Sequence, residues 1–74
     1  MILVKKIDES VYQVTESFVS FFETKISRWY YDTKRMLISE KPNFPDSMLT
    51  RKMDEHQYDN LMRWIKKGTN QGET

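Results

Sequence analysis

The stretch from Glu9 to Lys41, ESVYQVTESFVSFFETKISRWYYDTKRMLISEK, decides the fold, because it is nearly half of the chain and contains no glycine or proline. Its apolar residues recur at the i, i+3, i+4 spacing that is typical of an amphipathic helix. The residues that keep this phase are Val11, Val14, Phe18, Phe22, Ile26, Trp29 and Met36, with Thr33 filling one step. The pattern fits a single helix of about 30 residues, roughly 45 Å long. It fits equally well two helices separated by a tight turn near Phe22, with Thr24 capping the second.

The segments 2–19 and 48–65 resemble each other closely enough to form something near an internal repeat. Each segment predicts a short strand that runs into a helix opening with an Asp-Glu pair. In the second segment, Asp54 can accept hydrogen bonds from the first free N–H groups of the helix, and Gln57 stands at the capping-box position. We expect Asp8 to begin the first helix in the same way.

A proline-containing loop separates the two segments. Pro42 and Pro45 lie within four residues of each other and cannot continue a helix. We therefore expect an α+β, mostly helical fold with the order β-α(-α)-β-α, in which the two short strands pair with each other. The expected elements are a strand over 2–7, a helix over 9–39 that is continuous or interrupted near 23, a loop over 40–47, a strand over 48–53 and a helix over 54–67. Residues 1–68 would form a single domain, with Gly68 ending the last helix. Residues 69–74 would form a mobile polar tail.

The composition excludes several classes of function. The chain has 74 residues and a mass of 9.0 kDa, with no cysteine, one histidine and a formal net charge of +1. A disulfide and a thiolate metal cage are therefore excluded. His56, the single imidazole, falls in the first turn of the last expected helix, a position that is normally exposed. Because no base stands beside a nucleophile and no glycine-rich phosphate loop is present, we expect no enzymatic activity, no cofactor and no metal.

The N-terminal apolar run is short. Residues 1–4 are followed at once by Lys5 and Lys6, so this run is too short for the core of a signal peptide or for a membrane span. We therefore expect a cytoplasmic protein that does not contact a membrane.

Basic residues gather in the second half of the long stretch. On a helix, Lys25, Arg28 and Arg35 would lie on one side, with Tyr31 nearby and the apolar residues turned away. Such a face can dock on a phosphate backbone and reach base edges, and it can equally be an ordinary solvated helix face. Arg51 and Lys52 form a second basic group on the later strand.

Residues 15–31, TESFVSFFETKISRWYY, resemble the helix-turn-helix of small DNA-binding proteins. Asn43-Phe44-Pro45, followed by Leu61 and Trp64-Ile65, resembles the Phe-Pro, wing and Trp-containing helix of phage excisionases and related regulators with a MerR-like winged helix. The resemblance implies a small, non-enzymatic DNA-binding accessory or regulatory protein of phage or mobile-element type. It implies that the following residues contact DNA: Lys25, Ser27, Arg28, Tyr31 and Arg35 from the helix, and Arg51 and Lys52 from the wing.

The aromatic content supports an alternative function. Phe21, Tyr30 and Tyr12 fall outside the helical stripe, and together with the other large side chains they exceed what one helix face can bury in so small a core. They pack beneath the strands and the last helix, or they form an exposed patch for a second copy or another protein. The alternative is therefore a small protein-binding module or inhibitor of phage type that acts on a host protein, with a homodimer expected. Basic residues gathered on one face would favour DNA, and scattered ones beside an exposed aromatic patch would favour a protein.

Overall fold

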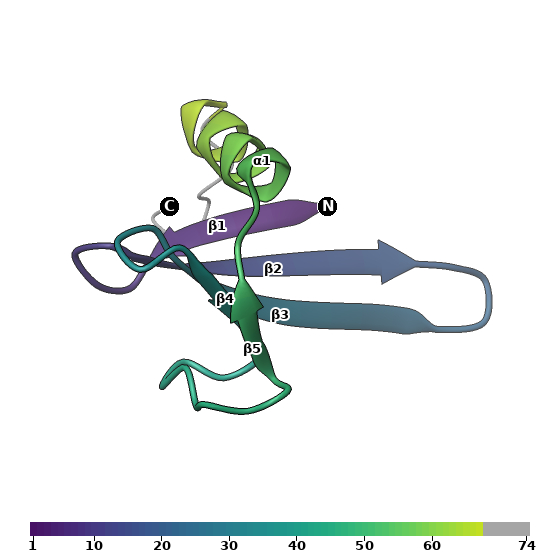
Figure 1. Ribbon diagram of the computed structural model, residues 1–74. Helices are drawn as coiled ribbons and strands as arrows, with labels where there is room; N and C mark the ends of the chain where they lie inside the picture. Colours follow the sequence, from purple (N-terminus) through teal and green to yellow (C-terminus); the bar gives the residue numbers. More distant parts are fainter. Residues whose placement is uncertain (68–74) are drawn as a thin grey trace.

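The computed structural model describes residues 1–67 and shows a five-stranded antiparallel sheet with one helix packed against one face (Figure 1). The strands are β1 (Ile2–Lys6), β2 (Val11–Val19), β3 (Thr24–Asp32), β4 (Leu37–Ser39) and β5 (Thr50–Lys52), and the helix is α1 (Glu55–Lys66). The order of the strands in the sheet, β1-β2-β3-β4-β5, is also their order in the chain. Every strand therefore pairs only with its neighbours in the sequence.

The expectation of a mostly helical fold is wrong, because residues 9–39 form β2, β3 and β4 instead of one or two helices. Most residues of the two long strands, VYQVTESFV and TKISRWYYD, are β-branched or aromatic. Such side chains favour a pleated, half-buried surface. The helical spacing misled because it partly coincides with strand spacing. Val14 and Phe18, four residues apart, share one face of a helix and also one face of a strand.

The turn between β2 and β3 forms without glycine or proline. The Ser20 backbone N–H donates to the Glu23 carbonyl at 2.9 Å, and the Ser20 hydroxyl accepts from the Glu23 N–H at 3.2 Å. Phe21 and Phe22 therefore occupy the end of the hairpin. Glycine is common in such turns because of its conformational freedom. Here the hydrogen bonds of the Ser20 hydroxyl stabilise the turn instead.

The expected pairing of the two short strands is also wrong, because they form the two opposite edges of the sheet. The short strands β1 and β5 do not pair with each other, because β1 pairs with β2, β5 pairs with β4, and three strands lie between them. Asp8 does not begin a helix either. It lies in the hairpin turn that follows β1, where its carboxylate accepts from the Glu9 N–H at 2.7 Å.

The final helix is confirmed. The Asp54 carboxylate accepts from the Gln57 N–H at 2.8 Å, and the Gln57 side chain accepts from the Asp54 N–H at 3.0 Å, so the predicted capping box is complete. The helix ends at Lys66, with Lys67 as its C-cap. The predicted ending at Gly68 and the predicted polar tail over 69–74 lie outside the described residues.

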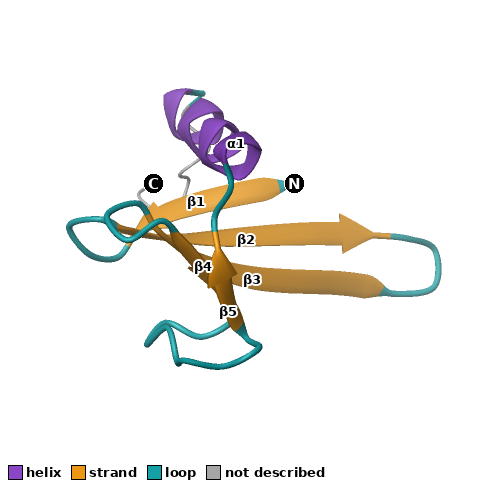
Figure 2. Cartoon of the chain, in the orientation of Figure 1, coloured by secondary structure: helices purple, strands orange, loops and turns teal. Residues whose placement is uncertain are grey.

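The core lies between α1 and one face of the sheet, which we call the inner face (Figure 2). Val4 of β1, Val14 of β2 and Leu61 of α1 are buried against one another, and Leu61 has no exposed surface. Tyr12, Tyr31 and Trp64 pack against this cluster and are partly buried. In Figure 1 the helix lies over β1, and the β2–β3 hairpin extends well beyond it. Among residues 1–67, no other element covers the far end of that hairpin.

Candidate protein-binding surface

The uncovered end of the β2–β3 hairpin exposes a cluster of large apolar side chains, which we call the apolar tip. Phe21 and Phe22 are fully exposed in the turn, and the strand residues beside them are more than half exposed, Phe18 at 63%, Val19 at 73% and Ile26 at 62%. Strand alternation places Phe18 on the inner face and both Val19 and Ile26 on the outer face. Apolar side chains therefore surround the end of the hairpin on both faces and at its tip.

The charges beside the apolar tip cancel each other. The Lys25 ammonium lies 3.5 Å from the Glu23 carboxylate, and both side chains are largely exposed. Such an exposed ion pair adds little to stability. Its effect on binding is to leave the tip without an excess of either charge.

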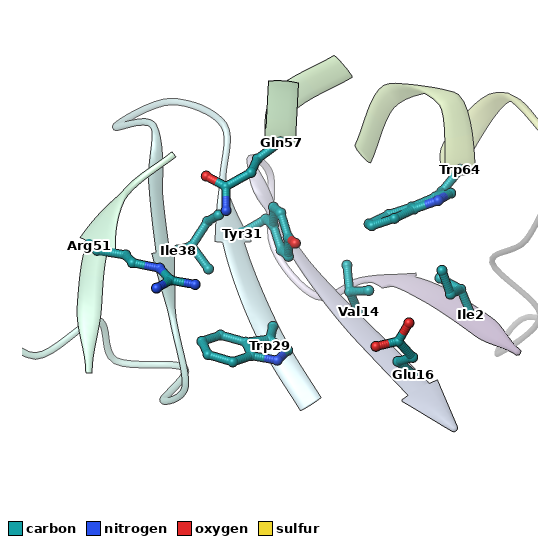
Figure 3. A pocket seen from close by; sticks show the side chains of 9 residues that line it. All are labelled: Ile2, Val14, Glu16, Trp29, Tyr31, Ile38, Arg51, Gln57 and Trp64. Carbon is teal, nitrogen blue, oxygen red and sulfur yellow. The ribbon is translucent and has the colours of Figure 1, made fainter. Parts of the chain in front are cut away.

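A second feature is an open pocket beside α1 on the inner face, with a volume of about 220 Å³ (Figure 3). Its apolar walls include Trp29, Tyr31 and Trp64, and its polar groups are Glu16, Arg51 and Gln57. We call this the aromatic pocket. Figure 3 shows that the pocket draws its side chains from β1 to β5 and from α1.

Aromatic contacts hold the pocket walls in place. The Tyr31 and Trp64 rings meet edge to face, with centroids 6.4 Å apart and an interplanar angle of 81°. The Arg51 guanidinium lies over the Trp29 ring, 5.5 Å from its centroid. Such a cation–π contact orients Arg51 across the inner face. Burial raises the pKa of the Tyr31 phenol, while the positive charge of Arg51 opposes that rise and the negative charge of Glu16 adds to it.

The residues predicted to contact DNA do not form one surface. By strand alternation, Lys25, Ser27, Tyr31 and Arg51 lie on the inner face, and Arg28 and Lys52 lie on the outer face. Arg35 lies in the turn after β3, where its Nε donates to the buried Asp32 carboxylate at 2.7 Å. The expected helix-turn-helix over 15–31 is wrong, because these residues form β2, a turn and β3. The resemblance to excisionases thereby loses the element on which most of it rested.

The three residues predicted for a protein interface lie far apart. Phe21 is at the apolar tip and fully exposed. Tyr30 lies on the outer face, where its hydroxyl accepts from the Gln13 side-chain amide at 3.2 Å. Tyr12 packs against the core cluster beneath α1. Of these three, Phe21 is the residue that lies on the candidate surface.

Tyr31 and Arg51, which were predicted to contact DNA, line the aromatic pocket, but sequence reasoning missed most other residues of the two sites. Phe18, Phe22, Ile26 and Trp29 were assigned to a buried helical stripe, yet three of them belong to the apolar tip and Trp29 lines the aromatic pocket. A signal was present in the pair Phe21-Phe22, because adjacent residues cannot both join one helical stripe.

Comparison with known proteins adds no relative. None of the family models, curated proteins or solved structures with which the chain was compared matches it. Within residues 1–67, no group of three or more His, Cys, Asp and Glu side chains is placed to hold a metal ion. Over the same range, no helix is long and apolar enough to cross a membrane.

Proposed function

We propose that this chain is a protein-binding module that inserts the apolar tip of its β2–β3 hairpin into an apolar cleft of another protein. The observation that carries the proposal is the full exposure of Phe21 and Phe22 at the end of a two-stranded projection. A solvent-exposed turn normally carries small and polar residues, so two adjacent phenylalanines are best explained by a partner that covers them.

The size of the apolar tip suits a specific interface. Phe18, Phe21 and Phe22 would together bury about 450–750 Å² at the usual 150–250 Å² per aromatic side chain. Stable complexes bury about 800 Å² per partner, so the tip supplies most of one contact surface. Because the apolar groups surround the end of the hairpin, the complementary shape is a socket rather than a flat face.

The charge distribution favours a protein over a lipid surface. Segments that bind membranes by an apolar edge usually carry an excess of Lys and Arg beside it. Here the Glu23 carboxylate neutralises the neighbouring Lys25 ammonium. The tip therefore has apolar attraction without the added attraction to anionic lipid.

The experiment begins with a photoreactive phenylalanine analogue at position 22, and at the exposed Asp59 of α1 as a control. The cross-linked partner is then purified and titrated with the protein. Replacing Phe21 and Phe22 together by serine should weaken binding by about 100-fold or more, because each buried phenylalanine is worth about 1.5–3 kcal/mol. Met48→Ser removes another fully exposed apolar side chain, in the 40–49 loop, and should change nothing.

Two results would contradict the proposal. One is an equal affinity of the partner for the double variant and the parent, and the other is cross-linking from position 22 to lipid alone.

The two remaining predictions have tests of their own. DNA binding stays a prediction, and titration with duplex DNA at two salt concentrations tests it through the salt dependence that phosphate contacts impose. The predicted homodimer is tested by sedimentation of the parent and the double variant.

A further inference from the structure

One edge of β3 is unpaired over residues 24–29, and we call this the open edge. β4 pairs only with Tyr30 to Asp32 of β3. After Ser39 the chain turns away, and the Glu40 N–H donates to the Leu49 carbonyl at 3.1 Å instead of continuing along β3. Every residue from 24 to 28 is exposed. Within residues 1–67, no strand lies against the open edge.

The hydrogen-bond pattern identifies which backbone groups point outward from the open edge. Because Ser20 bonds to Glu23, residues 20 and 23 form a hydrogen-bonded position of the hairpin. Such positions alternate with non-hydrogen-bonded ones along an antiparallel pair. Lys25, Ser27 and Trp29 therefore bond to β2. Thr24, Ile26 and Arg28 direct their N–H and C=O groups away from β2, as Tyr30 does where it meets β4.

Positive side chains flank the open edge on both faces. On the inner face, Lys25 stands beside it, and Arg51 reaches from β5 to lie over Trp29 at its end. On the outer face, Arg28 stands beside it with Thr24 and Ile26. Of these cations Lys25 is paired with Glu23, so Arg28 and Arg51 remain as charges that a carboxylate could neutralise.

We propose that the open edge accepts an extended segment of the partner protein as an additional β-strand, with acidic side chains beside Arg51 and Arg28. This inference rests on the proposed function, because the segment belongs to the protein that covers the apolar tip. A strand rises by about 3.3 Å per residue, so the edge accommodates about six residues over roughly 20 Å. In strand addition, main-chain hydrogen bonds give affinity and pockets for alternate side chains give specificity. The aromatic pocket, which begins at Trp29, is placed to take such a side chain.

Like charges make a second copy of this chain a less suitable occupant of the open edge. When two β3 edges pair antiparallel about Lys25, the two Lys25 ammonium groups stand directly opposite each other, which is destabilising. An acidic segment of another protein meets no such repulsion, so the charges favour a foreign strand.

The test uses two synthetic hexapeptides, Val-Glu-Val-Glu-Val-Glu and Val-Lys-Val-Lys-Val-Lys, with blocked ends. Backbone amide exchange and chemical shifts are followed by NMR during titration. The acidic peptide should slow exchange at the outward-pointing amides of Thr24, Ile26 and Arg28, and should bind at least tenfold more tightly than the basic peptide. The glutamates of this peptide share one face of a strand and can meet Arg51 or Arg28, which lie on opposite faces, so Arg51→Gln combined with Arg28→Gln should reduce that preference severalfold.

A proline substitution tests the hydrogen bonds directly. Ile26→Pro removes an N–H that points away from β2, so the hairpin can keep its ladder, whereas binding of the acidic peptide should weaken at least tenfold. Ile26→Thr keeps the N–H and the β-branched side chain, and it should bind like the parent. Should Ile26→Pro unfold the protein, N-methylation of alternate peptide amides tests the same bonds from the ligand side and should abolish binding.

The outcomes separate this inference from the proposed function. Replacing Phe21 and Phe22 by serine should leave peptide binding at the open edge intact, although it should strongly weaken binding of the purified partner. Binding of the acidic peptide without protection of Thr24, Ile26 and Arg28 would overturn the inference, and so would equal binding of the two peptides. Suppose that the Phe21 and Phe22 variant no longer binds the partner and that either of these peptide results is also found. The proposed function would then stand on the apolar tip, and the open edge would have no part in binding.

Discussion

Asp32 is a buried carboxylate that joins the turn after β3 to the rest of the sheet. Its Oδ1 accepts from the backbone N–H groups of Lys34 and Arg35 and from the Ser10 hydroxyl, and its Oδ2 accepts from Arg35 Nε at 2.7 Å. Burial by itself would raise the pKa of Asp32, but the hydrogen bonds from Arg35 and Lys34 and the Arg35 charge outweigh burial and lower it. The ionised form is therefore the one that the fold stabilises.

The lowered pKa makes stability depend on pH in one direction. The contribution of Asp32 is present above the ordinary carboxyl pKa of 3.8 and is lost as the pH falls through the lower value of the folded state. Asp32→Asn places an amide N–H₂ or a neutral oxygen against the Arg35 donor, and should cost about 1–3 kcal/mol at pH 7. Urea unfolding at pH 7 and at pH 2 measures the effect, and the difference between variant and parent should shrink at the lower pH.

The control for this prediction is Asp59→Asn, which changes an exposed carboxylate on α1. It should leave the unfolding curves nearly unchanged at both pH values. A cost for Asp32→Asn that is the same at pH 7 and pH 2 would show that the charge of Asp32 plays no part.

At the scale of elements, α1 begins at a capping box whose two hydrogen bonds join Asp54 and Gln57. Asp54→Ala removes an acceptor for a free N–H of the first turn and should destabilise the protein by about 0.5–2 kcal/mol. Gln57→Ala removes only the reciprocal bond and should cost less. Denaturant unfolding of both single variants and the double variant gives the coupling, and strictly additive effects would contradict a reciprocal box.

The capping box was predictable from the sequence because it depends on two residues at fixed spacing. The two short strands were also placed correctly, since 2–7 encloses β1 and 48–53 encloses β5. The similarity between segments 2–19 and 48–65 was misleading, because Asp8-Glu9 turns the chain into β2 and Asp54-Glu55 starts a helix. The same dipeptide serves both structures, and the residues after it decide between them.

The two long strands were not predicted because their apolar spacing satisfies a helix as well. Between Val11 and Asp32 the β-branched and aromatic residues favour strands. Their preference depends on packing against side chains of neighbouring strands, and the sequence alone does not show which residues become neighbours. The turn at Phe21-Phe22 lacks the Gly, Asn or Pro that would have divided the segment. Consequently the candidate surface was predicted only in part: Phe21 was named for an interface, while its neighbours were assigned to the core.

At the scale of the whole molecule, Leu61 holds the two layers together. It is fully buried between α1 and the sheet, in contact with the cluster that contains Val4 and Val14. Leu61→Ala should cost about 2–5 kcal/mol, which is comparable to the roughly 3–5 kcal/mol that a core of this size supplies. We expect this variant to be largely unfolded at 25 °C.

Circular dichroism and urea unfolding measure this loss. Arg63→Ala, an exposed change two residues along the same helix, serves as the control and should stay folded. A Leu61→Ala protein that unfolds at the same urea concentration as the parent would contradict a shared core between helix and sheet.

The order of the strands also determines how the chain can assemble. Short connections join β1 to β2, β2 to β3 and β3 to β4, so this part of the sheet can form hairpin by hairpin on the microsecond timescale. Packing Leu61 on Val4 is different, because it closes a loop that spans nearly the whole described chain. During synthesis the strands emerge before the helix, and at about 5–20 residues per second the inner face waits on the order of a second for its cover. In that interval the apolar inner face is a target for chaperones and for other nascent chains.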